Sequence, residues 1–467
     1  MHNMYVYHWL INNFTLKTLV PALLILLAPA TSYGEDNYHA VFSEDLGQVT
    51  VNACFDGPAP GHLYHDDAAL SFTEFIQANG RKIELSSRYG RSRLPDLPPN
   101  SCLRWRISLA QAADTASERV AMRLDSGYLT NGALWFWRDN DRRSILLQVT
   151  VPEGVSLSAP WALRQAGTEL TYSPAPTPAG WTSRIAVGRF SIKRTPVPGT
   201  DLLLAVTGNL SKQQRDKLAG WISESADSVA GVLGEFPQAD VQVLVVPIGP
   251  RREAVPWAHV IRGGGPAVEF FVDETRPLEE YRADWVATHE LSHLLLPLIT
   301  RKDRWLSEGL ASYYQNVLRA RDGRLTEKQA WQRLNSGFER GRSGTRGIMR
   351  VYWSGAAILL KADTRLRALT DGRQSLDTAL AGLHECCFEN NRSWKAGELF
   401  TELDRLTGLG VFAELLQEKL IDEGFPDVNE TFSKLGVLST SGGILLDDKA
   451  PLSRIRQDIM TGGASWY

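Results

Sequence analysis

Residues 284–318 read DWVATHELSHLLLPLITRKDRWLSEGLASYYQNVL and carry the most specific pattern of the 467-residue chain. Apolar residues at helical spacing predict one helix over residues 283–296, ended near Pro297, and a second over residues 305–321. His289 and His293 are four residues apart, so the first helix places both imidazoles on one face, one turn apart. A turn at Pro297 makes the two helices antiparallel and lets the second aim Glu308 back at these histidines.

Two histidines and a glutamate in this order suit a catalytic zinc site. In the HExxH pattern of residues 289–293, both imidazoles bind Zn²⁺ and Glu290 reaches a water on the metal. With Glu308 as the third ligand, the fourth position stays open to water, as a catalytic site requires. We therefore predict His289, His293 and Glu308 as zinc ligands and Glu290 as the general base. The alternative is a structural helix with two unrelated histidines, which the joint presence of HELSH and WLSEG disfavours.

HELSH followed by WLSEGLASYY resembles the gluzincin metallopeptidases. Downstream, VYWSGAAILLKADTRLRAL at residues 351–369 is similar to the Y-x-K-G helix of the glycyl aminopeptidase family, and the resemblance extends over residues 283–437. It implies a thermolysin-like catalytic domain behind an N-terminal β domain, and a zinc-dependent hydrolase of peptides. It also implies that Tyr352 hydrogen-bonds the oxyanion formed during hydrolysis.

Two departures from the family pattern bear on the substrate. Ser354 stands where the family has lysine, and no clear G-x-M-E-N segment, which holds a substrate's amino group, is present. Glu269 on an expected edge strand is the nearest substitute, with a solvent-facing strand residue as the alternative. Aminopeptidase and endopeptidase activity both stay open. An alternative function is a zinc-binding, catalytically impaired factor for peptide binding or assembly.

The composition is that of a soluble globular protein. Hydrophobic residues make up 43% of the chain and charged residues 22%, and the net charge of −3 favours neither nucleic acid nor an anionic membrane as a partner. The expected partner is a peptide or protein substrate. The oligomeric state is not predicted.

The N-terminus predicts export to the periplasm or out of the cell. Lys17 precedes the apolar run 19–30, which is too short to span a bilayer and fits the core of a signal peptide. We expect residues 1–34 to be this peptide, with an uncleaved anchor as the alternative, and no stable membrane insertion after cleavage. Four cysteines suit an oxidising compartment. Cys54 and Cys102 could pair, whereas the adjacent Cys386 and Cys387 could stay reduced, bridge each other or pair elsewhere.

The element pattern predicts an α+β fold with a β-sandwich-like N-terminal domain, a thermolysin-like catalytic domain and a helical C-terminal region. The expected domains are 35–198, 199–372 (gluzincin catalytic) and 373–437, followed by a tail at 438–467. Expected strands are 49–55, 102–110, 133–138, 144–152, 241–246 and 267–272. Expected helices are 210–233, capped by Ser211, one capped by Thr326, then 352–369, 376–384, 395–406 and 411–421.

Three weaker patterns complete the analysis. The segment GHLYHDD, with His62, His65, Asp66 and Asp67, is expected to be a solvated turn rather than a second metal site. A basic run precedes Tyr352 and is either an exposed loop or a contact for a substrate carboxylate. Its members are Arg340, Arg342, Arg346 and Arg350. Ser312 and Asp303 are candidates for orienting a zinc ligand.

Overall fold

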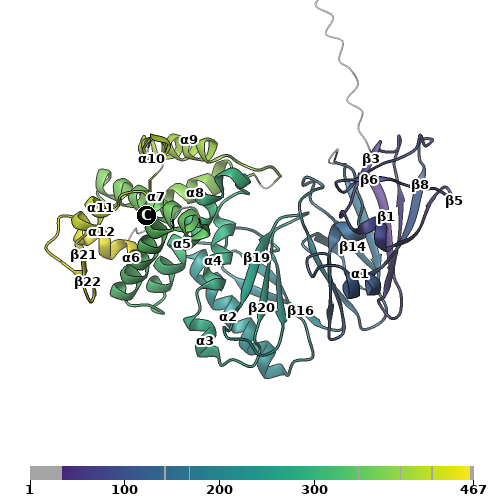
Figure 1. Cartoon of the computed structure of the whole chain (residues 1–467), viewed down its shortest axis with the longest axis horizontal. Coiled ribbons are helices and arrows are strands. Elements are labelled where there is room, and N and C mark those ends of the chain that lie inside the picture. Colours follow the sequence, from purple (N-terminus) through teal and green to yellow (C-terminus); the bar gives the residue numbers. More distant parts are fainter. Residues whose placement is uncertain are drawn as a thin grey trace, which may run out of the picture. The chain divides into compact units, whose positions relative to one another are not determined.

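Strands precede helices along the chain, which confirms the predicted α+β fold class. The computed structural model describes residues 34–140, 143–167, 169–344, 347–389, 391–421 and 424–462 (Figure 1). The predicted signal peptide, apart from Gly34, and Arg346 of the basic run lie outside these ranges. Among the residues described, no helix is long and apolar enough to cross a membrane.

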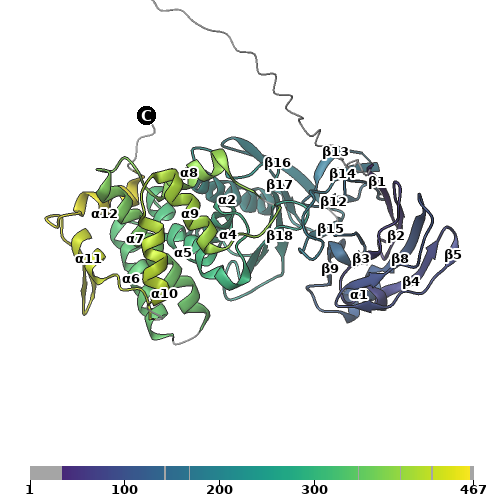
Figure 2. The same ribbon diagram turned by 90° about the horizontal axis from the view of Figure 1, so that it is seen from above.

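The N-terminal part consists of sheets whose strands alternate buried and exposed side chains. An eight-stranded sheet has the order β13-β14-β11-β1-β2-β8-β4-β5, and a four-stranded sheet has the order β12-β15-β10-β9 (Figure 2). In β8, the side chains of Leu103, Trp105 and Ile107 are all buried, as the two-residue period of a strand with one buried face requires. A three-stranded sheet, β3-β7-β6, accompanies them. The strands of the eight-stranded sheet are β1 (Asp36–Phe42), β2 (Gln48–Cys54), β4 (Thr73–Ala78), β5 (Arg81–Lys82), β8 (Cys102–Ser108), β11 (Ile145–Thr150), β13 (Ala162–Gln165) and β14 (Glu169–Ser173). The others are β3 (His62–Tyr64), β6 (Ser87–Arg88), β7 (Arg91–Arg93), β9 (Ala121–Leu124), β10 (Gly127–Asn131), β12 (Ser156–Ser158) and β15 (Arg184–Gly188), with helix α1 at Leu109–Thr115.

The predicted strand at 133–138 is wrong. The chain forms a short 3-10 helix at Gly132–Leu134, and the indoles of Trp135 and Trp137 are fully buried. Trp137 stacks on Trp105 with ring centroids 4.8 Å apart. Phe136 between them is buried in the same core, whereas a strand would send neighbouring side chains to opposite faces. Close to this core, a disulfide joins Cys54 to Cys102 across the paired strands β2 and β8.

A five-stranded sheet follows, in the order β16-β17-β18-β20-β19. Strands β17, β18 and β20 run parallel, and β19 is an antiparallel edge strand. The predicted strands at 241–246 and 267–272 are confirmed as β18 and β20. The helix predicted at 210–233 is confirmed as α2, and Ser211 caps it in a reciprocal capping box with Gln214. The bounds are β16 (Ser191–Val197), β17 (Thr200–Val206), α2 (Lys212–Ala230), β18 (Gln242–Pro247), β19 (Trp257–Ile261) and β20 (Ala267–Val272).

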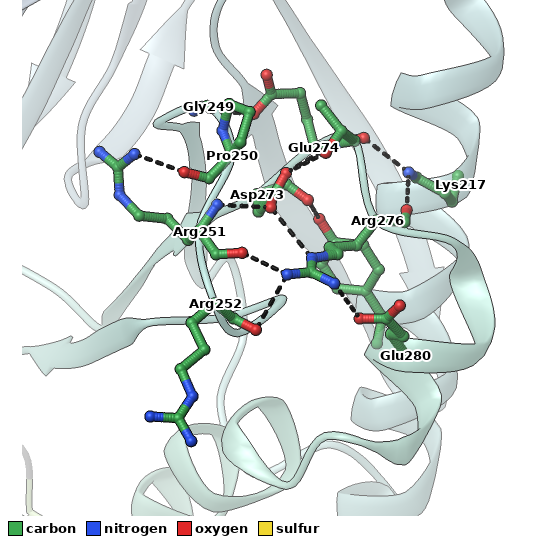
Figure 3. A network of polar contacts seen from close by, with 11 residues as sticks. Lys217, Gly249, Pro250, Arg251, Arg252, Asp273, Glu274, Arg276 and Glu280 are labelled. Atoms are coloured by element: carbon green, nitrogen blue, oxygen red, sulfur yellow. Dashed lines mark hydrogen bonds and ion pairs between the residues drawn. The ribbon is translucent and has the colours of Figure 1, made fainter.

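A polar network at the end of β20 fixes the start of the helical part (Figure 3). The buried carboxylate of Asp273 accepts hydrogen bonds from the backbone N–H of Arg251, at 2.7 Å, and from the guanidinium of Arg276, at 3.2 Å. The hydroxyl of Tyr281 donates to the carbonyl of Asp273. These bonds tie β20 to helix α3 (Leu278–Ala283), which directly precedes the helix that carries His289.

The helix predicted at 283–296 is shorter than expected. Helix α3 ends at Ala283, α4 covers Val286–Ser292, and a 3-10 turn continues it over His293–Leu295. The next helices are α5 (Arg304–Arg321), α6 (Glu327–Ser343) and α7 (Ile348–Leu369), which begins before Tyr352. Thr326 caps α6 as predicted. The predicted helices after α7 are confirmed as α8 (Leu376–Cys386), α9 (Ala396–Thr407) and α10 (Val411–Ile421).

The segment expected to be a polar tail contains regular structure. After α11 (Asn429–Leu435), strands β21 (Val437–Thr440) and β22 (Gly443–Leu446) form a hairpin, and α12 covers Ser453–Thr461. Ile459 and Met460 of α12 are buried in the core of the helical part. The domain boundaries proposed from the sequence stay predictions.

Candidate metal centre

The structure brings the three predicted ligands together. His289 lies on α4, His293 begins the 3-10 turn that follows, and Glu308 lies near the N-terminus of α5. The Oε2 atom of Glu308 is 3.4 Å from Nε2 of His289 and 3.6 Å from Nε2 of His293. All three groups therefore converge on one point from two helices.

Hydrogen bonds at the opposite ring nitrogens orient both imidazoles. Nδ1 of His289 lies 2.8 Å from Oε1 of Gln315, and Nδ1 of His293 lies 2.8 Å from the hydroxyl of Ser307. The amide oxygen of Gln315 accepts and so holds the proton of His289 on Nδ1, which leaves the Nε2 lone pair free for a metal; the Ser307 hydroxyl can accept from His293 in the same way. The sequence analysis missed both residues. Gln315 is two turns beyond Glu308 on the same helix face, which is a signal that could have found it.

The two residues proposed from the sequence for this role lie elsewhere. The carboxylate of Asp303 accepts from the hydroxyl of Thr300 and from the backbone N–H of Ala396. Ser312 lines a neighbouring cavity, and no hydrogen bond of its hydroxyl to a histidine is present among the residues described. Among the described residues, neither candidate side chain has a hydrogen bond to His289, His293 or Glu308.

The donor set fits a zinc ion. In a tetrahedral site with bonds of roughly 2.0–2.1 Å, neighbouring ligand atoms lie about 3.3 Å apart, close to both observed separations. Within the described part of the chain, the buried Oε2 of Glu308 has no hydrogen-bond partner, and a cation at this point would satisfy it. Burial lowers the pKa of His293 to about 3, so its imidazole is in the neutral form that binds metals. Burial opposes ionisation of Glu308, but the two imidazoles beside its carboxylate leave its pKa lowered.

Glu290 and Tyr352 lie beside these ligands. A carboxylate oxygen of Glu290 and a ring nitrogen of each histidine all lie within 4.8 Å of one another. Burial raises the pKa of Glu290 to about 7. The ring of Tyr352 stacks on His289 with centroids 5.7 Å apart, and its hydroxyl interacts with the Glu308 carboxylate. Glu290, Glu308 and Tyr352 line one cavity of about 290 Å³.

A buried arginine fixes the end of the histidine-bearing segment. Arg262, directly after β19, donates from Nη2 to the carbonyls of His293 and Leu296, at 2.8 and 2.9 Å. The carbonyl of His293 also accepts from the backbone N–H of Leu296, and Pro297 has no N–H to offer it. Arg262 was not predicted, because it lies some 30 residues before the turn in an unremarkable strand sequence.

Two glycines set the distance between α5 and α7. A Cβ atom on Gly309 would lie 2.4 Å from the backbone of Gly355, and one on Gly355 would lie 1.9 Å from the carbonyl oxygen of Trp305. Only glycine permits this approach, because a methyl group would overlap the facing backbone. Glu308 precedes Gly309 and Tyr352 lies one turn before Gly355, so this contact places both side chains on the same cavity.

Glu269 is not the residue expected from the sequence. Its strand, β20, lies between β18 and β19 rather than at the edge, and its side chain is buried. Its carboxylate forms a 3.0 Å ion pair with the buried guanidinium of Arg184. Glu269 therefore neither faces solvent nor offers an unpaired negative charge to a substrate's amino group.

Part of the GHLYHDD segment forms strand β3, so the expectation of a solvated turn is wrong. His65 is buried rather than solvated, and its two ring nitrogens lie 2.8 Å from the hydroxyl of Ser92 and 2.8 Å from the carbonyl of Asp66. Both nitrogens are thus occupied by the fold. In the C-terminal helices, Cys386 and Cys387 form a disulfide with each other, which decides among the three pairings left open.

Comparison with solved structures identifies the fold. No family model and no curated protein matches this sequence. An aminopeptidase N family protein from Idiomarina loihiensis superposes with a TM-score of 0.66 at 14% identity, over 86% of this chain and 78% of that one. A mutant M1 zinc metallopeptidase from Deinococcus radiodurans, bound to a Tyr-Ser-Ala substrate, gives a TM-score of 0.53 at 16% identity, over 85% of this chain and 94% of that one. Yeast LTA4 hydrolase in complex with bestatin gives 0.52 at 12% identity, over 82% of this chain and 66% of that one. The chain therefore has the fold of the M1 zinc metallopeptidases.

Proposed function

We propose that this protein is a zinc-dependent metallopeptidase that hydrolyses peptide bonds. The observation that carries the proposal is the convergence of His289, His293 and Glu308 on one point, with Glu290 and Tyr352 on the same cavity. The Deinococcus radiodurans protein with this fold binds a tripeptide substrate, which supports a peptide as the substrate here.

The residues divide the reaction among them. A bound Zn²⁺ would supply a Lewis acid that polarises the scissile carbonyl and the attacking water. Glu290 takes a proton from that water and delivers it to the departing nitrogen, which is the work of a general base that becomes a general acid. The hydroxyl of Tyr352 donates a hydrogen bond to the oxygen on which negative charge develops. Such a donor contributes about 2.7–4 kcal/mol to the stability of a transition state.

We further propose that the protein is exported and acts in the periplasm or outside the cell. The apolar run at 19–30 is typical of a signal peptide. The two disulfides, Cys54–Cys102 and Cys386–Cys387, support an oxidising compartment, since cytosolic proteins seldom keep such bonds. Detection of the protein in the cytosolic fraction, with its N-terminus intact, would contradict export.

The test of the activity combines metal content with peptide hydrolysis. The purified protein is expected to bind about one equivalent of zinc and to cleave members of a mixed peptide library, with cleavage positions read by mass spectrometry. Glu290→Gln is expected to keep the metal and lose roughly 10²–10⁴-fold in rate, the usual contribution of acid–base catalysis. Glu279→Gln, an exposed glutamate on α3, is the matched control.

Each outcome has a definite meaning. Cuts at the first peptide bond alone would indicate an aminopeptidase, and internal cuts an endopeptidase. Full hydrolysis by Glu290→Gln, or purification without zinc-binding capacity, would contradict the proposal. A protein that binds zinc and peptides but cleaves none would instead be the peptide-binding factor named above as the alternative.

A further inference from the structure

A second cavity adjoins the proposed catalytic centre and carries positive charge. It has a volume of about 400 Å³ and lies between α5, α6 and α7. We call it the arginine groove and define it by Trp285, Gln315, Arg333, Arg340, Tyr352 and Trp353. Among the described residues that line it, none is acidic, and the neighbouring cavity at the metal centre has only Glu290 and Glu308 as acids.

The arginine groove lies next to the metal centre. Tyr352 lines both cavities, so the groove and the proposed reaction centre share a wall. Gln315 contacts Nδ1 of His289 at 2.8 Å, and the ring of Trp285 lies edge-on to the His289 ring at 5.1 Å between centroids. The groove and the cavity at the metal centre therefore adjoin each other at Tyr352.

Two arginines on one helix supply the charge. Arg333 and Arg340 are seven residues apart on α6, so they lie on the same face, about 10 Å apart along the helix axis. The guanidinium of Arg340 lies over the ring of Trp353, 5.4 Å from its centroid, which restricts the side chain. Neither arginine forms an ion pair with a described carboxylate, and both are exposed.

The surroundings raise the positive potential further. Arg319 on α5 is 1% exposed, and its Nε and Nη1 atoms have no hydrogen-bond partner among the described residues. Burial and then the charges of Arg333 and Arg324 lower the pKa of Arg319 to about 10, while Asp284 and Asp322 act in the opposite direction. A ligand that brings negative charge into the groove would offset the repulsion between Arg319 and Arg333.

We propose that the arginine groove binds a carboxylate of the peptide substrate and thereby makes the enzyme prefer acidic peptides. The carboxylate is either an acidic side chain or the C-terminal carboxylate on one side of the cleaved bond, because both present the same planar acceptor to a guanidinium. The rings of Trp285 and Trp353 contact the apolar part of that residue. This inference rests on the proposed peptidase function and adds the class of substrate.

The experiment uses the full chain and a set of matched peptides. One peptide sequence is synthesised with Asp, Asn or Lys at each position in turn, and with a free or an amidated C-terminus. The wild-type protein is expected to show kcat/KM about tenfold higher for a carboxylate at the matching position, which corresponds to about 1.4 kcal/mol. An Asp-over-Asn preference identifies a side chain, and an acid-over-amide preference identifies the terminus.

Variants assign the preference to the groove. Arg333→Gln and Arg340→Gln are expected to lose this preference through a higher KM for the acidic peptide. Arg342→Gln removes the same charge from the same helix outside the groove, where the guanidinium lies over Phe425, and is expected to behave as wild type. Equal losses in Arg342→Gln and Arg340→Gln, or a wild type that ignores the carboxylate, would overturn the inference.

A binding measurement separates the inference from the proposed function. Calorimetric titration of Glu290→Gln with the Asp and Asn peptides measures affinity without hydrolysis. If the wild type cleaves nothing while the Asp peptide binds about tenfold tighter in an Arg340-dependent way, the activity is refuted and the groove's selectivity stands. If peptides are cleaved and bound without regard to charge, the peptidase activity stands and the selectivity of the groove is refuted.

Discussion

Replacement of Gly355 by alanine tests whether the close contact of α5 and α7 holds the metal centre together. The new Cβ would lie 1.9 Å from the carbonyl oxygen of Trp305 and 2.8 Å from Cα of Gly309. The first distance is 1.5 Å short of the 3.4 Å at which ordinary contact begins. Both obstacles are backbone atoms, which cannot rotate away, so the two helices must move apart.

The expected cost follows from this displacement. Overpacking a core lowers the free energy of unfolding by about 1–3 kcal/mol, and the higher helix propensity of alanine offsets at most about 1 kcal/mol of this loss. Glu308 sits next to Gly309, and metal ligands tolerate shifts of only about 0.2 Å. We therefore expect Gly355→Ala to lower the unfolding temperature and to weaken zinc binding by about tenfold or more.

The assay pairs thermal unfolding with zinc affinity measured by chelator competition. Gly220→Ala is the matched control, because this glycine lies inside α2 and a Cβ there meets no atom within 4 Å. That substitution is expected to stabilise the protein by about 0.5–1 kcal/mol without changing zinc affinity. If Gly355→Ala behaves like Gly220→Ala in both measurements, the contact does not position the ligands and the reasoning is refuted.

Two further predictions concern the surroundings of His289. Gln315→Met removes the partner of the His289 Nδ1 atom and is expected to weaken zinc binding about 10–100-fold in chelator competition. Gln332→Met is the control and should leave zinc binding unchanged, because the Gln332 amide bonds Ser336 instead. Burial raises the pKa of Asp284 to about 6, against about 3.9 in an unfolded chain, so the folded protein keeps a proton that the unfolded chain releases. The contribution of Asp284 to the free energy of unfolding is therefore most favourable below about pH 4, and it decreases as the pH rises to about 6. Asp284→Asn should stabilise the protein by about 1–2 kcal/mol at pH 7 and leave it unchanged at pH 4, and equal unfolding temperatures at pH 7 would contradict this.

Local elements could be predicted where the chain's own spacing decides them. Two capping boxes join residues that are three positions apart, Ser211 with Gln214 and Thr326 with Gln329. Strand β20, which is buried throughout, was predicted from a run of residues that are all apolar except Glu269. The prediction failed at Trp135–Trp137, where an apolar run suggests a strand but the three rings fill one core in an irregular segment.

The failures at single residues share this origin. Glu269 looked like a free carboxylate because its partner, Arg184, lies 85 residues earlier in the chain. Helix α12 forms in the tail because Ile459 and Met460 are buried in the core. The polar residues on either side of them gave no indication of this burial in the sequence. In each case the deciding contact joins residues that lie far apart in the chain. Sequence patterns reveal only contacts between residues at a regular, short separation.

The sequence by itself determined the chemistry of the centre. His289, Glu290 and His293 are arranged by the geometry of one helix, and Glu308 follows on the next, so their convergence needs little beyond helix formation and a short link. Only the tertiary structure decided what surrounds them. The hydrogen bond of Gln315, the contact of Gly309 with Gly355 and the charge of the arginine groove arise where separate helices pack, and packing depends on the whole folded core.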